Sequence, residues 1–187
     1  MTNDAKLFDI ISRRSFRQGG QFTLASGRTS TIYFNLKPAI LHPEGARLIG
    51  ATVAERAAAL GAELVGGLEL GAVPIVAAVA AMSAVAGRPV GAVLVRKEAK
   101  GHGTRSLIEG LADGEALAGK RVVVVEDVTT TGGSALKAIA ALRDAGAEVR
   151  DVVTVVDREE GAAVAFAAAA VALHALFRKS EFAGDEG

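Results

Sequence analysis

The stretch that decides the fold is RVVVVEDVTTTGGSALKAIAALRDA, residues 121–145. Residues 122–125 are consecutive valines, a run typical of a strand buried on both faces of a parallel sheet. From residue 134 or 135 onward, apolar side chains recur at helical spacing, and Gly146 marks a stop. The stretch therefore predicts a central strand, a loop and a helix, the repeating unit of a parallel α/β sheet.

The loop between this strand and this helix has the composition of an anion-binding site. Its hydroxyls and glycines are Thr129, Thr130, Thr131, Gly132, Gly133 and Ser134. Backbone N–H groups can approach a ligand there, and the helix N-terminus adds a partial positive charge. The loop lacks the Gly-Lys-Ser/Thr of a Walker loop and the G-x-G-x-x-G of a dinucleotide site, so neither class is indicated.

Glu126 and Asp127 stand between the valines and the loop. Two carboxylates would repel a nucleoside triphosphate, whereas vicinal sugar hydroxyls donate hydrogen bonds to them. A ribose 5-phosphate group suits both features. VVVVEDVTTTGGSA, residues 122–135, resembles the phosphoribosyl-pyrophosphate (PRPP) signature of type I phosphoribosyltransferases. The resemblance implies that residues 126–134, Val128 included, bind PRPP; the alternative is an ordinary strand–turn–helix with solvated acids.

Length and composition restrict the fold and the partners. The 187 residues suit a single domain, residues 1–187, with its own core. With 21 basic and 21 acidic residues, nothing in the net charge favours a nucleic-acid or membrane partner. The absence of cysteine excludes disulfides and thiolate metal sites. Because no signal pattern or transmembrane segment is predicted, we expect a cytoplasmic protein.

Strand and helix patterns alternate on both sides of the central stretch. Helices are predicted over residues 43–60, from residue 74 and over 159–170, and strands over residues 64–68, 90–95, 149–156 and 171–177. The turn at residues 69–73 borders the pyrophosphate in the resembling family; the alternative is a plain β–α turn. We expect His42 and His174 to be structural. These patterns predict a type I phosphoribosyltransferase-like α/β fold, with a mainly parallel central sheet flanked by helices.

The N-terminal part lies outside this alternation. Residues 4–17 have a helical pattern, and residues 21–35 contain two alternating runs around a Ser-Gly-Arg turn, which predicts a hairpin. We expect residues 1–40 and the C-terminal segment to form a small hood. FTLASGR followed by YFN resembles the N-terminal motif of orotate phosphoribosyltransferases, which implies that Tyr33 and Phe34 lie near the base. The alternative is packing in the hood core.

A cationic segment follows the predicted strand at residues 90–95. Its charged and titratable side chains are Arg96, Lys97, Lys100, His102 and Arg105. A segment of this kind suits a lid that closes on a polyanion. RKEAKGHG closely resembles the catalytic loop of orotate phosphoribosyltransferases. The resemblance implies that residues 97–110 form a mobile loop directly after Arg96. It also implies that Arg96, Lys97, Lys100 and His102 bind pyrophosphate, and that Lys100 and His102 are catalytic. The alternative is a solvated surface loop.

Arg158 follows the predicted strand at residues 149–156. Ligands of open α/β sheets bind at the carboxyl ends of the strands, and the planar guanidinium suits a carboxylate. By the same resemblance, Arg158 with the Thr130 hydroxyl binds orotate. The alternative is a pairing of Arg158 with a surface glutamate.

The resemblance as a whole implies transfer of ribose 5-phosphate from PRPP to orotate, giving orotidine 5′-monophosphate and pyrophosphate. It also implies Mg²⁺ held mainly by PRPP, and a homodimer in which the loop at residues 97–110 completes the neighbouring site. Ala25 departs from the family, some members of which have a lysine there that reaches the ligands. Two alternatives stay open: a transferase for another base such as a purine, and a PRPP-sensing regulator without catalysis.

Overall fold

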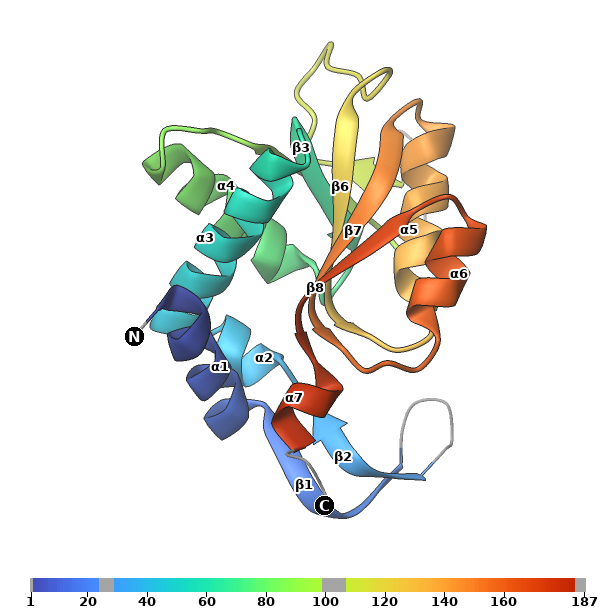
Figure 1. Ribbon diagram of the computed structural model, residues 1–187. Coiled ribbons are helices and arrows are strands. Elements are labelled where there is room, and N and C mark those ends of the chain that lie inside the picture. Colours follow the sequence, from blue (N-terminus) through green and yellow to red (C-terminus); the bar gives the residue numbers. More distant parts are fainter. Residues whose placement is uncertain (1, 24–28, 99–106, 184–187) are drawn as a thin grey trace.

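The computed structural model describes residues 2–23, 29–98 and 107–183, and its centre is a six-stranded sheet (Figure 1). The strands are β3 (Leu64–Leu68), β4 (Gly91–Val95), β5 (Ile108–Glu109), β6 (Arg121–Thr129), β7 (Glu148–Asp157) and β8 (Ala172–Arg178). Their order is β5-β4-β3-β6-β7-β8, and every pairing except β4 with β5 is parallel. The predicted valine-rich strand lies inside the sheet, between β3 and β7, and its four valines are fully buried.

Helices cover both faces of this sheet (Figure 1). They are α3 (Pro43–Ala59) and α4 (Val73–Val85) on one face, and α5 (Gly133–Asp144) and α6 (Ala162–Ala168) on the other. A Cβ atom added at Gly50 would lie 2.7 Å from the carbonyl oxygen of Ala78, so glycine allows α3 and α4 to cross closely. The predicted fold class, a mainly parallel α/β sheet flanked by helices, is confirmed.

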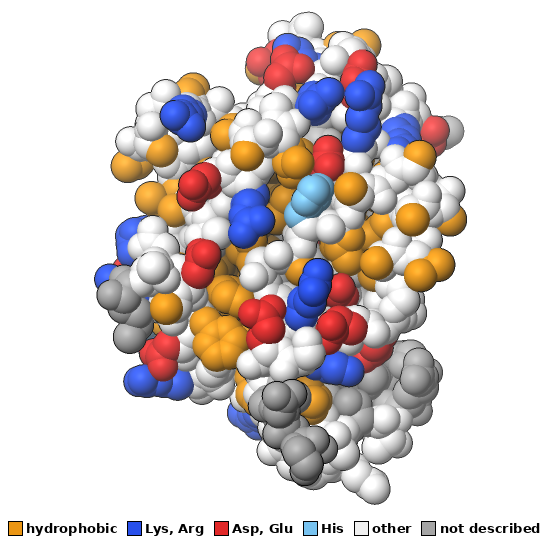
Figure 2. Space-filling view, viewed as in Figure 1, with side chains coloured by type: hydrophobic (Ala, Val, Ile, Leu, Met, Phe, Trp, Pro, Cys, Tyr) orange, Lys and Arg blue, Asp and Glu red, His pale blue; other side chains and the backbone are white. Residues whose placement is uncertain are grey.

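The face of the molecule seen in Figure 2 mixes charges of both signs. Lysine and arginine side chains alternate with aspartate and glutamate, and hydrophobic side chains lie between them. Binding of an anion must therefore depend on a local arrangement of groups rather than on the general field of this face. Among the described residues, no helix has the length and apolar character needed to cross a bilayer.

The hood lies at one end of the sheet (Figure 1). Its elements are α1 (Asn3–Arg14), β1 (Phe16–Thr23), β2 (Thr29–Phe34), α2 (Lys37–Ile40) and α7 (Lys179–Ala183). The predicted hairpin is present as the antiparallel pair β1 and β2. The predicted helix over residues 4–17 was too long, because Phe16 pairs with Phe34 across the hairpin and starts β1.

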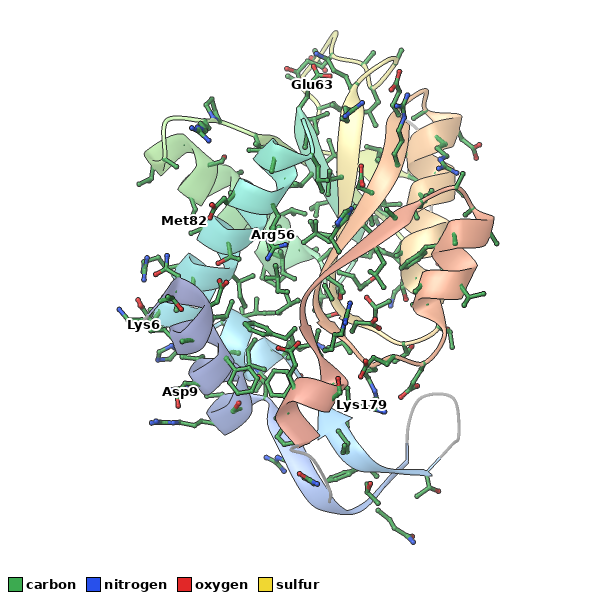
Figure 3. The ribbon with its side chains drawn as sticks, in the orientation of Figure 1. Lys6, Asp9, Arg56, Glu63, Met82 and Lys179 are labelled. Atoms are coloured by element: carbon green, nitrogen blue, oxygen red, sulfur yellow. The ribbon has the colours of Figure 1, made fainter. Side chains whose placement is uncertain are left out.

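Aromatic rings join the N-terminal elements of the hood to its C-terminal helix α7 (Figure 3). The rings in contact are those of Phe8, Phe16, Phe34, Phe177 and Phe182. Phe182 of α7 stacks on Phe8 of α1 at a centroid distance of 4.5 Å, and it contacts the other three rings as well. Helix α7 is therefore held against α1, β1 and β2 by ring packing.

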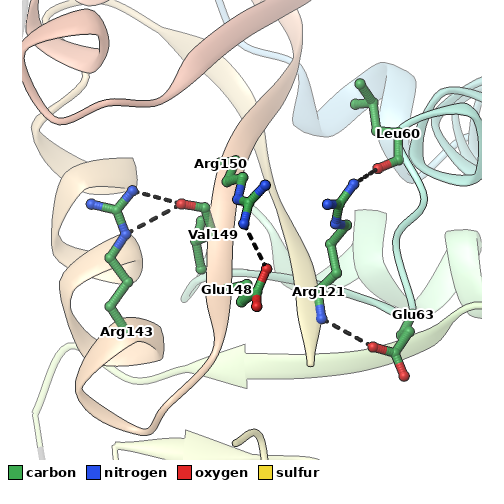
Figure 4. A network of polar contacts seen from close by, with 7 residues as sticks. All are labelled: Leu60, Glu63, Arg121, Arg143, Glu148, Val149 and Arg150. Carbon is green, nitrogen blue, oxygen red and sulfur yellow. Dashed lines mark hydrogen bonds and ion pairs between the residues drawn. The ribbon is translucent and has the colours of Figure 1, made fainter. Parts of the chain in front are cut away.

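Arginine side chains donate hydrogen bonds to backbone carbonyl oxygens near the amino ends of the strands (Figure 4). Arg121 of β6 donates from Nη1 to the carbonyl oxygen of Leu60 at 3.0 Å, and its backbone N–H donates to Glu63 at 3.1 Å. Arg143, in the last turn of α5, donates to the carbonyl oxygen of Val149 on β7 from both Nε and Nη2. These bonds satisfy backbone groups at the amino end of the sheet, opposite the end where a ligand is expected.

Replacing Phe182 tests the attachment of the C-terminal segment. We expect Phe182→Ala to lower the free energy of unfolding by about 3 kcal/mol, because a buried ring with four aromatic neighbours leaves a cavity. Urea denaturation measures the change. Val164→Ala, at a side chain on α6 that is 75% exposed, is the control and should leave the midpoint unchanged. Equal midpoints for both variants would show that the hood is stable without this ring.

Candidate active site

The two predicted acids, Glu126 and Asp127, lie within strand β6 rather than after its end. The prediction ended the strand at Val125, but pairing with β7 continues from Glu126 with Thr154 to Thr129 with Asp157. The extended strand fixes both acids in place. Glu126 is only 7% exposed, and its Oε2 accepts no hydrogen bond from the described residues.

The Glu126 carboxyl is difficult to ionise. Burial raises its pKa to about 8, and the negative charge of the adjacent Asp127 contributes to the rise. Asp127 itself accepts a hydrogen bond at Oδ1 from the backbone N–H of Val128, at 2.9 Å. The pair therefore offers one carboxyl whose Oε2 has no hydrogen-bond partner among the described residues, and one that is oriented by the backbone.

The predicted anion-binding loop begins directly after β6. Gly132 is the residue before α5, with a φ of 83°, and its carbonyl oxygen accepts the first helical bond from Leu136. A Cβ atom at Gly132 would lie 2.8 Å from the Phe166 ring, so only glycine fits this turn. The helix was predicted from residue 134 or 135 and starts slightly earlier, at Gly133.

This loop encloses a small hollow of about 30 Å³, the phosphate hollow. Its lining residues are Glu126, Val128, Thr129, Thr130, Gly132, Gly133 and Ser134. Thr129 is 2% exposed, and its Oγ1 has no hydrogen-bond partner within the described residues. The structure thus brings most of the predicted PRPP-binding residues together; Thr131 lies in the same turn, with its side chain exposed.

A second hollow of about 240 Å³, the central hollow, adjoins the first. Its lining residues are Lys37, Leu68, Glu69, Leu70, Gly71, Lys97, Glu126, Asp127 and Ser134. Glu126 and Ser134 belong to both hollows, so one ligand can extend from the anion loop past the paired acids. A more voluminous hollow of about 380 Å³, between α3 and α4, is lined largely by alanines near the amino end of the sheet. It contains none of the predicted site residues.

The loop between β3 and α4 approaches the acids closely. A Cβ atom at Gly71 would lie 2.8 Å from Oδ1 of Asp127, so the backbone of this loop lies directly against that carboxylate. Glu69 accepts a hydrogen bond from the backbone N–H of Lys97 at 2.7 Å, which ties the loop to the start of the cationic segment. The peptide bond between Glu69 and Leu70 is cis. The turn predicted at residues 69–73 thus borders the central hollow.

The cationic segment is only partly brought to the site. Lys97 lines the central hollow and also a neighbouring hollow beside α5. Arg96 lines the hollow beside α5 but not the central one, and it forms an ion pair with Glu109 at 3.0 Å. Lys100 and His102, the predicted catalytic residues, lie outside the described residues. Within the loop predicted over residues 97–110, Ile108 and Glu109 form the short strand β5.

Arg158 lies at the carboxyl end of β7, where it was predicted, but it is deeply buried. Only 4% of it is exposed, and Nη2 pairs with Oε1 of Glu160 at 2.8 Å. Its Nε is buried without a partner among the described residues, and its backbone N–H donates to the carbonyl oxygen of Thr129 at 2.9 Å. The residue is therefore joined to the end of β6, although it lines neither of the two hollows.

The remaining side chains named in the sequence analysis are the two hood aromatics and His174. Phe34 is buried among the hood rings, as in the alternative interpretation, whereas Tyr33 is 36% exposed and stacks on Phe22. His174 pairs with Asp151 at 2.8 Å, which agrees with a structural role. Sequence reasoning missed Lys37; its one signal was a basic residue directly after the YFNL motif of the hood.

Comparison with known proteins identifies the family. Residues 43–169 match the family model described as a phosphoribosyl transferase domain. An orotate phosphoribosyltransferase of Bradyrhizobium sp. (strain ORS 278) is 57% identical over 178 residues, covering 95% of this chain and 96% of that protein. An orotate phosphoribosyltransferase of Thermosynechococcus vestitus is 47% identical, and the match covers 94% of this chain and 90% of that protein. The chain belongs to the orotate phosphoribosyltransferase family.

A solved orotate phosphoribosyltransferase has the same fold. The crystal structure of the Mycobacterium tuberculosis H37Rv protein in complex with PRPP has a TM-score of 0.80 and 38% identity, covering 98% of this chain and 100% of that one. The family predicted from the PRPP signature, the hood motif and the cationic segment is thereby confirmed.

Burial of Glu126 makes stability depend on pH. The unfolded carboxyl, with a pKa near 4.5, loses its proton as the pH rises, while the folded carboxyl keeps it up to about pH 8. Stability therefore falls between these pH values. We expect Glu126→Gln, which stays neutral, to have the wild-type melting temperature at pH 4.5 and a progressively higher one than wild type toward pH 8.

Calorimetric scans across this pH range measure the difference. Glu63→Gln is the control, because the hydrogen bond from Lys120 lowers the pKa of the Glu63 carboxyl. This variant should gain nothing at pH 8. A constant difference between Glu126→Gln and wild type at every pH would contradict the prediction.

Proposed function

We propose that this chain transfers the ribose 5-phosphate group of PRPP to orotate, giving orotidine 5′-monophosphate and pyrophosphate in pyrimidine biosynthesis. Membership of the orotate phosphoribosyltransferase family supports this activity. The observation that carries the proposal is the phosphate hollow beside paired acids, continuous with a larger hollow that contains lysines. PRPP has a phosphate at one end, ribose hydroxyls in the middle and a pyrophosphate at the other end. These groups match, in order, the phosphate hollow, the paired acids and the hollow lined by lysines.

The paired acids are proposed to bind the ribose hydroxyls. A hydroxyl that donates to the partnerless Oε2 of Glu126 would supply the hydrogen bond missing in the folded chain. Such a bond favours the ionised carboxylate, because hydrogen bonding to the charged form lowers a pKa. The sugar is then held by its diol, with the 5-phosphate against the hydroxyls and N–H groups of residues 129–134.

The reaction requires positioning and charge neutralisation rather than a covalent nucleophile. As the bond between the anomeric carbon and pyrophosphate breaks, positive charge develops on the sugar and negative charge on the leaving group. Lys97 is proposed to face the leaving pyrophosphate, with Arg96, Lys100 and His102 from the cationic segment. Orotate is proposed to approach from the β7 side, where Arg158 offers its guanidinium to the carboxylate and Thr130 a hydroxyl.

A divalent cation is part of the proposal. Among the described residues, no three His, Cys, Asp or Glu side chains lie together as a metal cage. Mg²⁺ prefers oxygen ligands and keeps several from its substrate, so most of its ligands would come from PRPP, with Asp127 and Glu126 near the ribose hydroxyls. When bound, the cation neutralises charge on the pyrophosphate.

A homodimer is also proposed, with the loop at residues 97–110 of one subunit completing the site of the other. Two observations support it. Helix α4 contains no charged residue, yet its Val85 is 79% exposed, and Leu70 in the adjacent loop is 66% exposed. Arg96 lies beside α5 rather than in the central hollow of its own chain. A cytoplasmic location stays a prediction.

Substrate choice tests the proposed function. With PRPP and Mg²⁺, we expect the purified chain to consume orotate, followed by the loss of its ultraviolet absorbance, and to leave hypoxanthine and adenine unchanged. An arginine aimed at the base pocket favours a carboxylate-bearing base over a neutral purine. Consumption of a purine without consumption of orotate would overturn the assignment.

Mixed dimers test whether sites are shared. Lys100→Ala and Arg158→Ala are each expected to be nearly inactive alone. If the loop and the base pocket of one site come from different chains, mixing equal amounts of the two variants after mild dissociation should restore about a quarter of the wild-type activity. Random pairing makes about half of the dimers mixed, and one of the two sites in each mixed dimer is intact. A mixture that stays inactive, while mixed wild-type subunits regain activity, would show that each chain completes its own site.

A further inference from the structure

The central hollow has an unusual balance of charges. Three acids line it, namely Glu69, Glu126 and Asp127, and within the described residues only Lys37 and Lys97 oppose them. A pyrophosphate group is highly charged, so it needs cations in direct contact in order to enter a hollow lined by carboxylates. Lys97 comes from the segment after β4, whereas Lys37 comes from the opposite side, the hood.

Lys37 is held by a hydrogen bond at its backbone, and its side chain extends from a short helix. It begins α2, where its backbone N–H donates to Oδ1 of Asn35 at 3.3 Å. The neighbouring Leu36, Ala39 and Ile40 are buried in the core and anchor this short helix. The Lys37 side chain is exposed, and its ammonium has no hydrogen-bond or ion-pair partner in the part of the chain that the structure describes. By contrast, Lys120 is neutralised by Glu63 at 2.7 Å.

We infer that the Lys37 ammonium binds the pyrophosphate group of PRPP and stabilises it as it leaves. This inference rests on the proposed function. The pyrophosphate end is favoured over the 5-phosphate end because Lys37 lines the central hollow with the β3–α4 loop and does not line the phosphate hollow. Lys37 also lies outside residues 43–169, the part matched by the family model, so its role is not implied by that match.

The position of Lys37 adds a contact that the cationic segment cannot make. Lys97 is tied by its backbone to Glu69 at 2.7 Å, on the side of β3 and β4. A second ammonium from α2 faces the same ligand from the hood, so the leaving group is bound between cations on two separate elements. Because the buried neighbours of Lys37 limit the movement of α2, the backbone from which this side chain extends is fixed before the ligand arrives.

The experiment compares Lys37→Met, Lys37→Arg and, as the matched control, Lys6→Met. Lys6 is an exposed lysine on the outer side of α1, remote from the central hollow (Figure 3). We expect Lys37→Met to weaken Mg²⁺-pyrophosphate binding in calorimetric titration, and to lower kcat/KM for PRPP, by at least about tenfold, as is typical for loss of a charged hydrogen bond. Lys37→Arg should recover most of the affinity, and Lys6→Met should match wild type.

Two further measurements separate binding from folding and from the proposed function. Ribose 5-phosphate affinity, KM for orotate and the melting temperature should be nearly unchanged in Lys37→Met, since none depends on a contact to pyrophosphate. Wild-type affinity for pyrophosphate in Lys37→Met, or equal losses for pyrophosphate and ribose 5-phosphate, would overturn the inference. If the wild-type chain itself does not consume orotate with PRPP, the proposed function fails, and pyrophosphate titration still decides whether Lys37 binds this anion.

Discussion

Burial of the Glu126 carboxyl at the end of a strand of valines is the constraint on which the site depends. Four fully buried valines hold β6 between β3 and β7, and the strand continues without a break through both acids. The carboxyl is therefore held in a largely buried position, and its raised pKa reflects that burial. A hydrogen-bond donor placed at Oε2 would favour the ionised form, so the burial that lowers stability at neutral pH is consistent with the sugar binding proposed above.

Unsatisfied polar atoms gather at the same edge of the sheet. Among the described residues, five buried side-chain atoms lack a hydrogen-bond partner, and three of them belong to Glu126, Thr129 and Arg158. All three lie at the carboxyl ends of β6 and β7, which are neighbouring strands. At the amino ends, arginines from β6 and α5 satisfy backbone carbonyls. Because buried polar groups are normally paired, this difference between the two edges indicates where a ligand completes the structure.

The sequence predicted the sheet well because its strands are local patterns. The run at residues 64–68 forms β3 with the predicted bounds, and the valines of β6 lie in the middle of the sheet. The bounds of α1 and β1 were missed because they depend on Phe16 meeting Phe34, a contact between separate segments. The ion pair of Arg96 with Glu109 of β5 was not predicted for the same reason, because it also joins residues that are far apart in the sequence. Contacts of this kind have no periodicity that a sequence can display.

The site is assembled by the hood as much as by the sheet. Glu159 accepts a hydrogen bond from the backbone N–H of Ser180 at 3.0 Å, so the turn that carries Arg158 is joined to the start of α7. Helix α7 in turn is packed on α1 through Phe182 and Phe8. The turn that carries Arg158 and the hood are thus parts of one packed unit. A change in hood packing would therefore alter the position of Arg158 and, through the hydrogen bond from its backbone N–H to the carbonyl oxygen of Thr129, the start of the anion-binding loop as well.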